Sequence, residues 1–191
     1  MEVKRQNVGM AKLLYSVTMS LDGYIAGPGG DMSWMKPYLG PNPYVDELIG
    51  EIGSLLVGNR TFRGDDPHRG TPAEGEAFGG GWSGPQVVLT HHLPEAEWPG
   101  ITFVSDFAEA VRQAKEAAGD KYVNVLGAEV ARQCVAAGVL DEVLTCIAPV
   151  LLGDGVRLFE EPGGRTVALE RMHLSGVPLA SMLRFRVRPA G

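Results

Sequence analysis

The sequence has no apolar run long enough to cross a membrane, and it has only two cysteines in 191 residues. A bilayer span needs about 20 apolar residues, and the first nine residues, MEVKRQNVG, also lack the apolar stretch of a signal peptide. Cys134 and Cys146 lie in apolar segments without zinc-like spacing, which indicates buried free thiols in a reducing compartment. These absences predict a cytoplasmic protein with no disulfide framework and no membrane partner.

Positive charge is also scarce. The chain has 17 Lys and Arg against 23 Asp and Glu, a net charge of −6, which argues against a general nucleic-acid binder. A hydrophobic content of 45% and a charged content of 21% are typical of a soluble globular protein. We find no internal repeat or linker, so we expect a flexible tail over residues 1–9 and a single domain over 10–191.

Short β-forming runs alternate along the chain with stretches of helical spacing. This alternation predicts an α/β fold with three layers, in which helices flank a mostly parallel mixed sheet. The first strand, residues 12–20, is expected to be buried on both faces. Strands are predicted at residues 12–20, 24–26, 54–57, 86–90, 101–104, 122–126 and 141–150. Helices are predicted at 44–52, at 107–118 and from 128 to Gly138. An antiparallel C-terminal hairpin is predicted from residues 167–175 and 180–187, joined through 176–178.

A single glycine separates strand from helix in KYVNVLGAEVARQCVAA, residues 121–137. The first N–H groups of a helix have no intrahelical partners and carry partial positive charge, which favours a phosphate. The turn is therefore predicted to receive the pyrophosphate of a dinucleotide. An ordinary strand-to-helix turn is the alternative, because one glycine is much weaker than a full dinucleotide fingerprint. The turn consists of Gly127, Ala128, Glu129 and Val130.

A second glycine turn, Gly58-Asn59-Arg60-Thr61, follows another predicted strand. Glycine permits close backbone approach, and arginine and threonine can donate hydrogen bonds to phosphate oxygens. A surface arginine beside a helix cap is the alternative. Thr90 and His91 leave a further strand, and ligands of such sheets bind at the carboxyl ends of the strands. Proteins that bind NADH usually have an acidic residue after a strand, where it binds the ribose. Neither the Gly58 turn nor the segment after Leu89 has one, which favours NADPH.

Three side chains are candidates for the substrate side of the site. Asp22 leaves the first strand beside a glycine and could accept hydrogen bonds from a ring or relay a proton, or it could cap its own turn. Asp46 lies at the start of the helix at 44–52 and is a candidate proton donor, although acids there commonly just suit the helix dipole. Trp34, among turn-forming residues, could cover a ring or plug the core.

The stretch 63–84 is rich in glycine and predicts a surface loop or a flap over the site. Asp65, Asp66 and His68 could ligate a metal, but the sequence offers no matching ligands elsewhere. We therefore expect a solvated loop and no metal site.

Several segments resemble the dihydrofolate reductase-like superfamily, and in particular its branch similar to the reductase domain of bifunctional riboflavin-biosynthesis proteins. The resemblance extends over nearly the whole chain from Met10 and is more specific for fold than for substrate. Its carriers are SLDGYIA at 20–26, LVGNRTF at 56–62, VVLT at 87–90, VLGA at 125–128, LDE at 140–142, PVLLGDG at 149–155 and LF at 158–159.

The resemblance implies an NADPH-dependent reductase, with a small heterocyclic substrate such as a 5-amino-6-(ribosylamino)uracil-type pyrimidine of riboflavin synthesis. It places Gly58–Thr61 at the cofactor phosphates, Thr90 and His91 near the adenosine, and Gly127–Val130 at the pyrophosphate. It also places Asp22 in the substrate pocket and implies a homodimer. Reduction of a pterin, as in dihydrofolate reductase, is an alternative, as is a catalytically silent module that binds a nucleotide or a flavin.

Two departures from the family pattern bear on function. The turn usually has two adjacent glycines, whereas this chain has Gly127-Ala128, so the extra methyl group is expected to crowd the pyrophosphate. The sequence also shows no deaminase domain ahead of the reductase, which predicts a stand-alone reductase-like domain.

Overall fold

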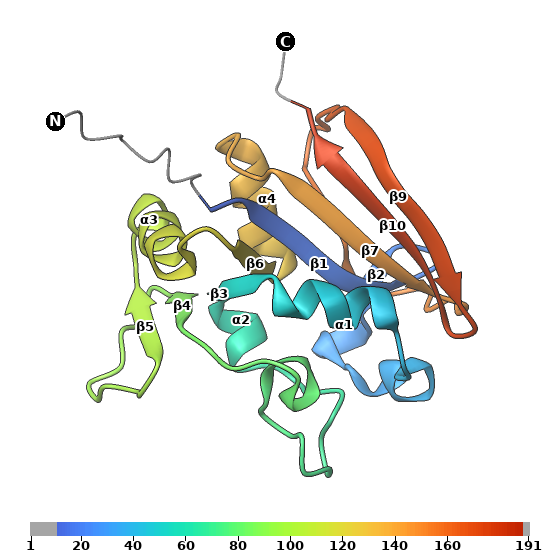
Figure 1. Ribbon diagram of the computed structural model, residues 1–191, viewed down its shortest axis with the longest axis horizontal. Helices are drawn as coiled ribbons and strands as arrows, with labels where there is room; N and C mark the ends of the chain where they lie inside the picture. The colour runs from blue at the N-terminus through green and yellow to red at the C-terminus, as the bar shows by residue number, and fades with distance from the viewer. Residues whose placement is uncertain (1–10, 189–191) are drawn as a thin grey trace, which may run out of the picture.

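The computed structural model describes residues 11–188, and the predicted N-terminal tail lies outside them. Eight strands form one mixed sheet in the order β5-β4-β3-β6-β1-β7-β10-β9 (Figure 1). The first six strands in this order, from β5 at the edge to β7, are parallel, as predicted. Strand β10 runs antiparallel to its neighbours β7 and β9, also as predicted. The strands are β1 (Leu13–Ser20), β3 (Ile52–Gly58), β4 (Gln86–Leu89), β5 (Ile101–Val104), β6 (Tyr122–Leu126), β7 (Glu142–Ala148), β9 (Leu169–Val177) and β10 (Ala180–Val187). A separate antiparallel pair joins β2 (Tyr24–Ala26) to β8 (Val156–Arg157).

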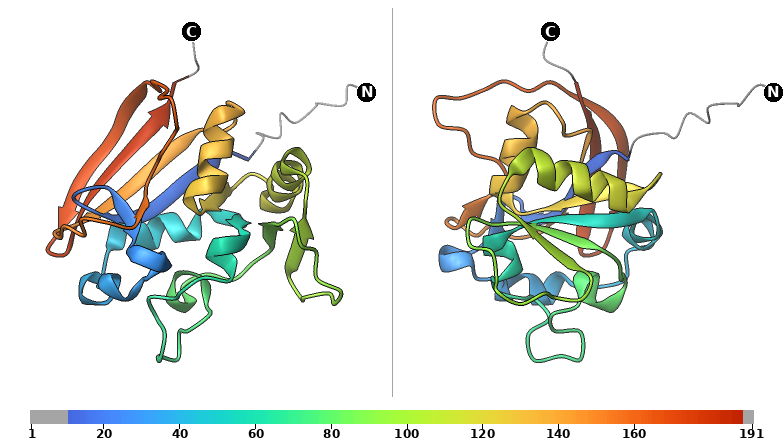
Figure 2. Two further views of the ribbon diagram at one scale, coloured as in Figure 1. Left: turned by 180° about the vertical axis from the view of Figure 1, so that it is seen from behind. Right: turned by 90° about the vertical axis from the view of Figure 1, so that its left-hand side faces the viewer.

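Helices cover both faces of the sheet, as the alternating pattern predicts. Helices α3 (Phe107–Ala118) and α4 (Ala128–Ala136) pack on one face, and α4 lies in front of the sheet in the left view of Figure 2. Helix α1 (Pro43–Gly50) packs on the other face through Leu48. Beside α1, the loop around Trp82 covers β3 and β4 on that same face. The remaining turns are α2 (Asn59–Phe62), η1 (Pro28–Gly30), η2 (Ser33–Tyr38) and η3 (Ala77–Gly80).

The helix ends follow the local sequence. Asp106 caps α3 as predicted, since its side chain accepts a hydrogen bond from the Glu109 amide at 2.8 Å. Asn42 caps α1 through the Val45 amide at 3.3 Å. The prediction that the α1 helix extends to residue 52 was wrong, because the helix ends at Gly50 and the β-branched Ile52 already begins β3.

Two strand boundaries also differ from the prediction. The C-terminal hairpin turns at residues 178–179 rather than at 176–178, because Gly176 pairs with Ser181 and Val177 with Ala180. This pairing leaves a two-residue connection, the length that antiparallel strands favour. Strand β7 ends at Ala148, before the proline at position 149, which has no N–H to donate to a ladder.

The first strand is buried on both faces only in its first half. Leu13, Leu14 and Tyr15 are buried, whereas residues 16–19 are half-buried. The expectation of complete burial was therefore wrong for the half of β1 nearest its carboxyl end. That half carries hydroxyl groups at alternate positions, which direct attention to the edge of the sheet where the strand ends.

Candidate functional site

Four predicted site segments end at one edge of the sheet. Strands β4, β3, β6 and β1 are neighbours in this order and run parallel, so their carboxyl ends lie side by side. Thr90 and His91 follow β4, the Gly58 turn follows β3, the Gly127 turn follows β6, and Asp22 follows β1. The strand order thus brings together residues that are up to about a hundred positions apart in the chain.

The two glycine turns touch each other. Gly127 has a φ of 107°, and a Cβ atom there would lie 2.6 Å from Oγ1 of Thr61. A Cβ atom on Gly58 would lie 3.0 Å from Cγ2 of Val130. A side chain at position 127 would collide with Thr61, and one at position 58 would contact Val130 tightly, so space favours glycine at both. Position 127 also needs glycine for its backbone conformation. Arg60, Thr61 and Glu129 are exposed, so the paired turns are open to solvent.

The start of α4 has the features of an anion site, with one acid beside it. No side chain caps this helix end, where Gly127 is the N-cap residue. Glu129 lies in the first turn but is paired with Arg132, with Nη2 2.7 Å from Oε1 and Nε 3.0 Å from Oε2. The Arg132 hydrogen bond lowers the pKa of Glu129, and the nearby charge of Arg60 contributes further. The arginines offset the negative charge that would otherwise repel a phosphate.

Thr90 and His91 differ in their exposure to solvent. Thr90 is 3% exposed, and its hydroxyl accepts a hydrogen bond from the His92 amide at 3.1 Å, which fixes the turn after β4. His91 is exposed on that turn. Of the two, His91 is the residue with a side chain at the surface, while Thr90 shapes the backbone beneath it.

Asp22 holds two loops together. Its carboxylate accepts hydrogen bonds from the Ser20 hydroxyl at 2.5 Å, the Leu152 amide at 3.1 Å and the Gly153 amide at 2.7 Å. The Ser20 hydrogen bond is the largest of the effects that lower its pKa to about 2. The group is therefore ionised at neutral pH. Each of its oxygens accepts a hydrogen bond from an amide of the loop after β7, and Oδ1 also accepts one from the Ser20 hydroxyl of β1.

Asp46 and Trp34 occupy different environments. Asp46 is exposed on α1, while its neighbours Val45 and Leu48 pack toward the sheet. Trp34, on η2, is half-buried and lies 6.3 Å from Tyr38 between ring centroids. Its Nε1 is buried and has no hydrogen-bond partner among the described residues.

The loop at 63–84 is fastened to η2. Oδ2 of Asp65 accepts a hydrogen bond from the Met32 amide at 3.0 Å, which lowers the pKa of Asp65, and Lys36 donates to the Arg69 carbonyl at 3.2 Å. Asp66 accepts hydrogen bonds from the amides of His68 and Gly75. These acids serve the loop itself, and residues 11–188 contain no group of three side chains suited to a metal ion.

Sequence reasoning missed a set of polar residues on the face of the sheet toward α1. Ser16 and Thr18 stand opposite Leu144 and Cys146 and share their face. Asn124 on β6 is completely buried, and neither atom of its amide has a partner in the described chain. The signal was present in LLYSVTMS, where hydroxyl residues recur at every second position, but the apolar content of the run concealed it.

Comparison with known proteins identifies the family and the fold of the chain. A model of the RibD C-terminal domain matches residues 11–178. The chain belongs to the RibD C-terminal domain family. Within the same described range, no helix has the length and apolarity to span a membrane.

Relatives of this RibD C-terminal domain protein share the fold at low identity. YyaP, an uncharacterised protein of Bacillus subtilis, is 24% identical over 163 residues, which are 80% of this chain and 82% of YyaP. The crystal structure of a putative riboflavin biosynthesis protein from Shewanella sp. PV-4 superposes with a TM-score of 0.69 at 22% identity, covering 94% of this chain and 99% of the other.

Two further structures mark the range of the superfamily. The Thermotoga maritima diaminohydroxyphosphoribosylaminopyrimidine deaminase/5-amino-6-(5-phosphoribosylamino)uracil reductase has a TM-score of 0.66 at 18% identity, and the match covers 94% of this chain but 57% of that longer protein. Dihydrofolate reductase from Enterococcus faecalis, complexed with NADP(H), has a TM-score of 0.57 at 17% identity, covering 94% and 97% of the two chains. The resemblance to the dihydrofolate reductase-like fold is thus confirmed.

Proposed function

We propose that this protein is an NADPH-dependent reductase of a small heterocycle, with a 5-amino-6-(ribosylamino)uracil-type pyrimidine as the leading substrate class. One observation carries the proposal: the Gly58 and Gly127 turns touch at the carboxyl edge of adjacent parallel strands. Two contiguous glycine turns, open to solvent and flanked by arginines, suit the diphosphate bridge of a dinucleotide. The family membership supports the same reading.

The residues present fit NADPH. The amides that begin α4 and the Thr61 hydroxyl would hold the pyrophosphate, Arg60 would neutralise its charge, and His91 would lie toward the adenosine. Ala128 replaces a second glycine, but its methyl group belongs to the first helical residue rather than to the positive-φ position, which Gly127 retains. We therefore expect weaker cofactor binding than with two glycines, rather than none.

When bound, NADPH supplies a hydride, and the protein contributes position and a proton route. Asp22, ionised and held by two backbone amides, would fix the rim of the substrate pocket rather than donate a proton. Asp46 is exposed on α1, so a proton would reach the substrate through water rather than directly from its carboxyl group. Trp34 would cover the substrate ring and satisfy its buried Nε1–H there.

The silent module remains the second candidate, because Asp46 is not on the inward side of α1. The deciding experiment is calorimetric titration of the protein with NADPH and with NADH, followed by NADPH absorbance after addition of pyrimidines and of dihydrofolate. We expect saturable binding with preference for NADPH and oxidation with a pyrimidine. Absence of binding to either nucleotide would refute the cofactor site, and binding without oxidation would favour the silent module.

We also propose that two copies pair through the sheet face opposite α1. There α3 and α4 cover the centre of the sheet, whereas β10 and β9 carry Leu183, Phe185 and Leu174 on the same side without a helix in front of them (Figure 2). Leu174 is 61% exposed and Leu169 is 47% exposed. A largely apolar sheet face can pack on its symmetry mate as sheets do in a sandwich, with the exposed Arg171 opposite Phe185 as its charged member.

Sedimentation analysis tests this pairing. The unaltered protein should sediment as a dimer, and Leu174→Glu should shift it to a monomer. Leu93→Glu, which changes a leucine that is 58% exposed in the loop after β4, should leave the dimer intact. A monomeric unaltered protein would contradict the proposal.

A further inference from the structure

The α1-side face of β1 changes character along the strand. Leu14 belongs to the apolar cluster under α1, but the next side chains on this face are Ser16, Thr18 and Ser20. Ser20 is completely buried and its hydroxyl accepts a hydrogen bond from the Tyr24 amide at 3.0 Å, so it belongs to the rim that Asp22 holds. A central strand that packed against a dry core would be apolar here. The hydroxyl groups therefore indicate a polar occupant.

Asn124 lies at the inner end of this polar row. It stands opposite Leu14 of β1 on one side and opposite Leu55 of β3 on the other. Leu14 belongs to the cluster under α1, while Leu55 belongs to the cluster under the loop around Trp82. Asn124 thus occupies the seam between two apolar clusters that cover the same face of the sheet.

Nothing in the described chain satisfies this amide. Both Oδ1 and Nδ2 are buried without a partner, although most buried polar groups in proteins have one. Leaving a buried donor and acceptor unpaired is unfavourable, and an apolar residue would avoid the penalty. Asn124 lies three residues before Gly127, on the strand that leads to the proposed cofactor site.

We propose that Asn124 forms the floor of the substrate pocket and pairs with a ring edge that presents an N–H beside a carbonyl. The inference rests on the proposed function and specifies its substrate class. A side-chain amide offers an acceptor and two donors side by side, which matches the lactam edge of a uracil-type ring. Ser16 and Thr18 follow Leu14 on the same face of β1, toward its carboxyl end. Trp34, with its own unpaired donor, lies on η2, ahead of α1 in the chain.

The test measures binding of 6-aminouracil to the protein saturated with NADP⁺, by calorimetry. Asn124→Leu should weaken this binding by at least about tenfold, because the lactam edge would lose its partners. Ser54→Ala is the matched control: Ser54 is equally buried on the adjacent strand, but its hydroxyl donates to the Ala114 carbonyl at 2.7 Å on the α3 side. This variant should bind 6-aminouracil as the unaltered protein does. The compound 1,3-dimethyl-6-aminouracil lacks the lactam N–H and should bind weakly to the unaltered protein and to both variants.

Thermal unfolding without ligand gives an independent readout. Asn124→Leu should raise the Tm by a few degrees, because it removes an unpaired amide, whereas Ser54→Ala should lower it. Should Asn124→Leu fail to fold, the side-chain amide resonance of Asn124, identified by its loss in Asn124→Asp, must shift on addition of 6-aminouracil and not of the dimethyl compound.

Three results would overturn the inference: equal 6-aminouracil affinity in the unaltered protein and Asn124→Leu, an unmoved Asn124 resonance, or no 6-aminouracil binding to the NADP⁺ complex. Each of these is compatible with normal NADPH binding and so leaves the proposed cofactor site standing, although absence of 6-aminouracil binding would also count against a pyrimidine substrate. Loss of NADPH binding by the unaltered protein would instead defeat the proposed function.

Discussion

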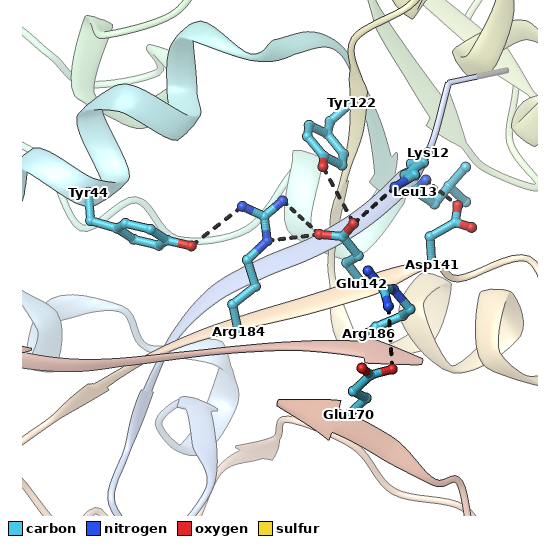
Figure 3. A network of polar contacts seen from close by, with 9 residues as sticks. All are labelled: Lys12, Leu13, Tyr44, Tyr122, Asp141, Glu142, Glu170, Arg184 and Arg186. Atoms are coloured by element: carbon cyan, nitrogen blue, oxygen red, sulfur yellow. Dashed lines mark hydrogen bonds and ion pairs between the residues drawn. The ribbon is translucent and has the colours of Figure 1, made fainter. Parts of the chain in front are cut away.

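Two buried polar side chains, Glu142 and Asn124, flank Leu14 on the same face of the sheet but have opposite surroundings. Glu142 is 1% exposed and accepts hydrogen bonds from Arg184 Nε at 2.8 Å and the Tyr122 hydroxyl at 3.4 Å (Figure 3). Lys12 adds an ion pair at 3.5 Å. Asn124 has no partner at all in the described chain.

The comparison separates a part of the face built for stability from a part kept for a ligand. The Glu142 network, which also includes Tyr44 of α1, ties the C-terminal hairpin to the centre of the sheet (Figure 3). A buried charge is tolerated there because Arg184, Tyr122 and Lys12 all donate to the carboxylate. Toward the other strands and the carboxyl edge, polar groups remain for something outside the chain to satisfy.

The largest effect is expected in the Glu142 network, on the free energy of unfolding. Glu142→Gln should lower the free energy of unfolding by about 3 kcal/mol or more, because it leaves the Arg184 guanidinium, 14% exposed, without its counter-charge. The measurement is urea unfolding, with NADPH affinity expected to stay unchanged. Glu170→Gln, which alters exposed pairs with Arg186 and Arg188, should cost less than about 1 kcal/mol. Similar losses in the two variants would erase the distinction.

On the ligand side, Gly127→Ala should have the next largest effect. The new methyl group would meet the Thr61 hydroxyl and force a φ of 107° on a residue with a Cβ. We expect NADPH affinity to fall at least about tenfold, with a stability loss of about 1–3 kcal/mol. Gly138→Ala provides a control with a positive φ of 68° but open space around it, at the far end of α4. Equal NADPH affinity in the two variants would contradict the proposed site.

A smaller, pH-dependent effect on stability is expected for Asp22. Its pKa is about 2 in the folded protein against an ordinary value of 3.8, so ionised Asp22 stabilises the fold above that ordinary value. The contribution is lost as the pH falls toward 2. The urea midpoint of Asp22→Asn should therefore depend less steeply on pH over this interval than that of the unaltered protein. Parallel pH curves would show that the carboxylate does not hold the two loops.

The smallest effect is expected for Asp46. Because its carboxylate is exposed on α1, Asp46→Asn should change turnover with a pyrimidine by less than about threefold, whereas loss of an essential proton donor commonly costs a hundredfold or more. Steady-state rates across the pH range provide the measurement. A fall of a hundredfold would return Asp46 to the role of proton donor and require α1 to turn inward.

The fold was largely predictable because it is encoded locally. Apolar runs ending in glycine, the Asp106 cap and the alternation of strands with helices specify each element without knowledge of its neighbours. The errors lie where neighbours decide: Ile52 belongs to a strand because β6 pairs with it, and the hairpin register is set by Ala180 facing Val177. The two glycine turns were predicted to follow strands, as they do, whereas the unpaired Asn124 was not anticipated, since an isolated asparagine in a strand has no local signature.

By itself the sequence determined where the chain bends, because glycines at positions 58 and 127 interrupt apolar β-forming runs. Only the tertiary structure decided which bends touch, which carboxylates are occupied and which amide is left without a partner. Strand order and the packing of α1 set those relations across more than a hundred residues of chain. Local preferences do not encode contacts over such separations, so the division of one sheet face between a satisfied charge and an unsatisfied amide emerges only on folding.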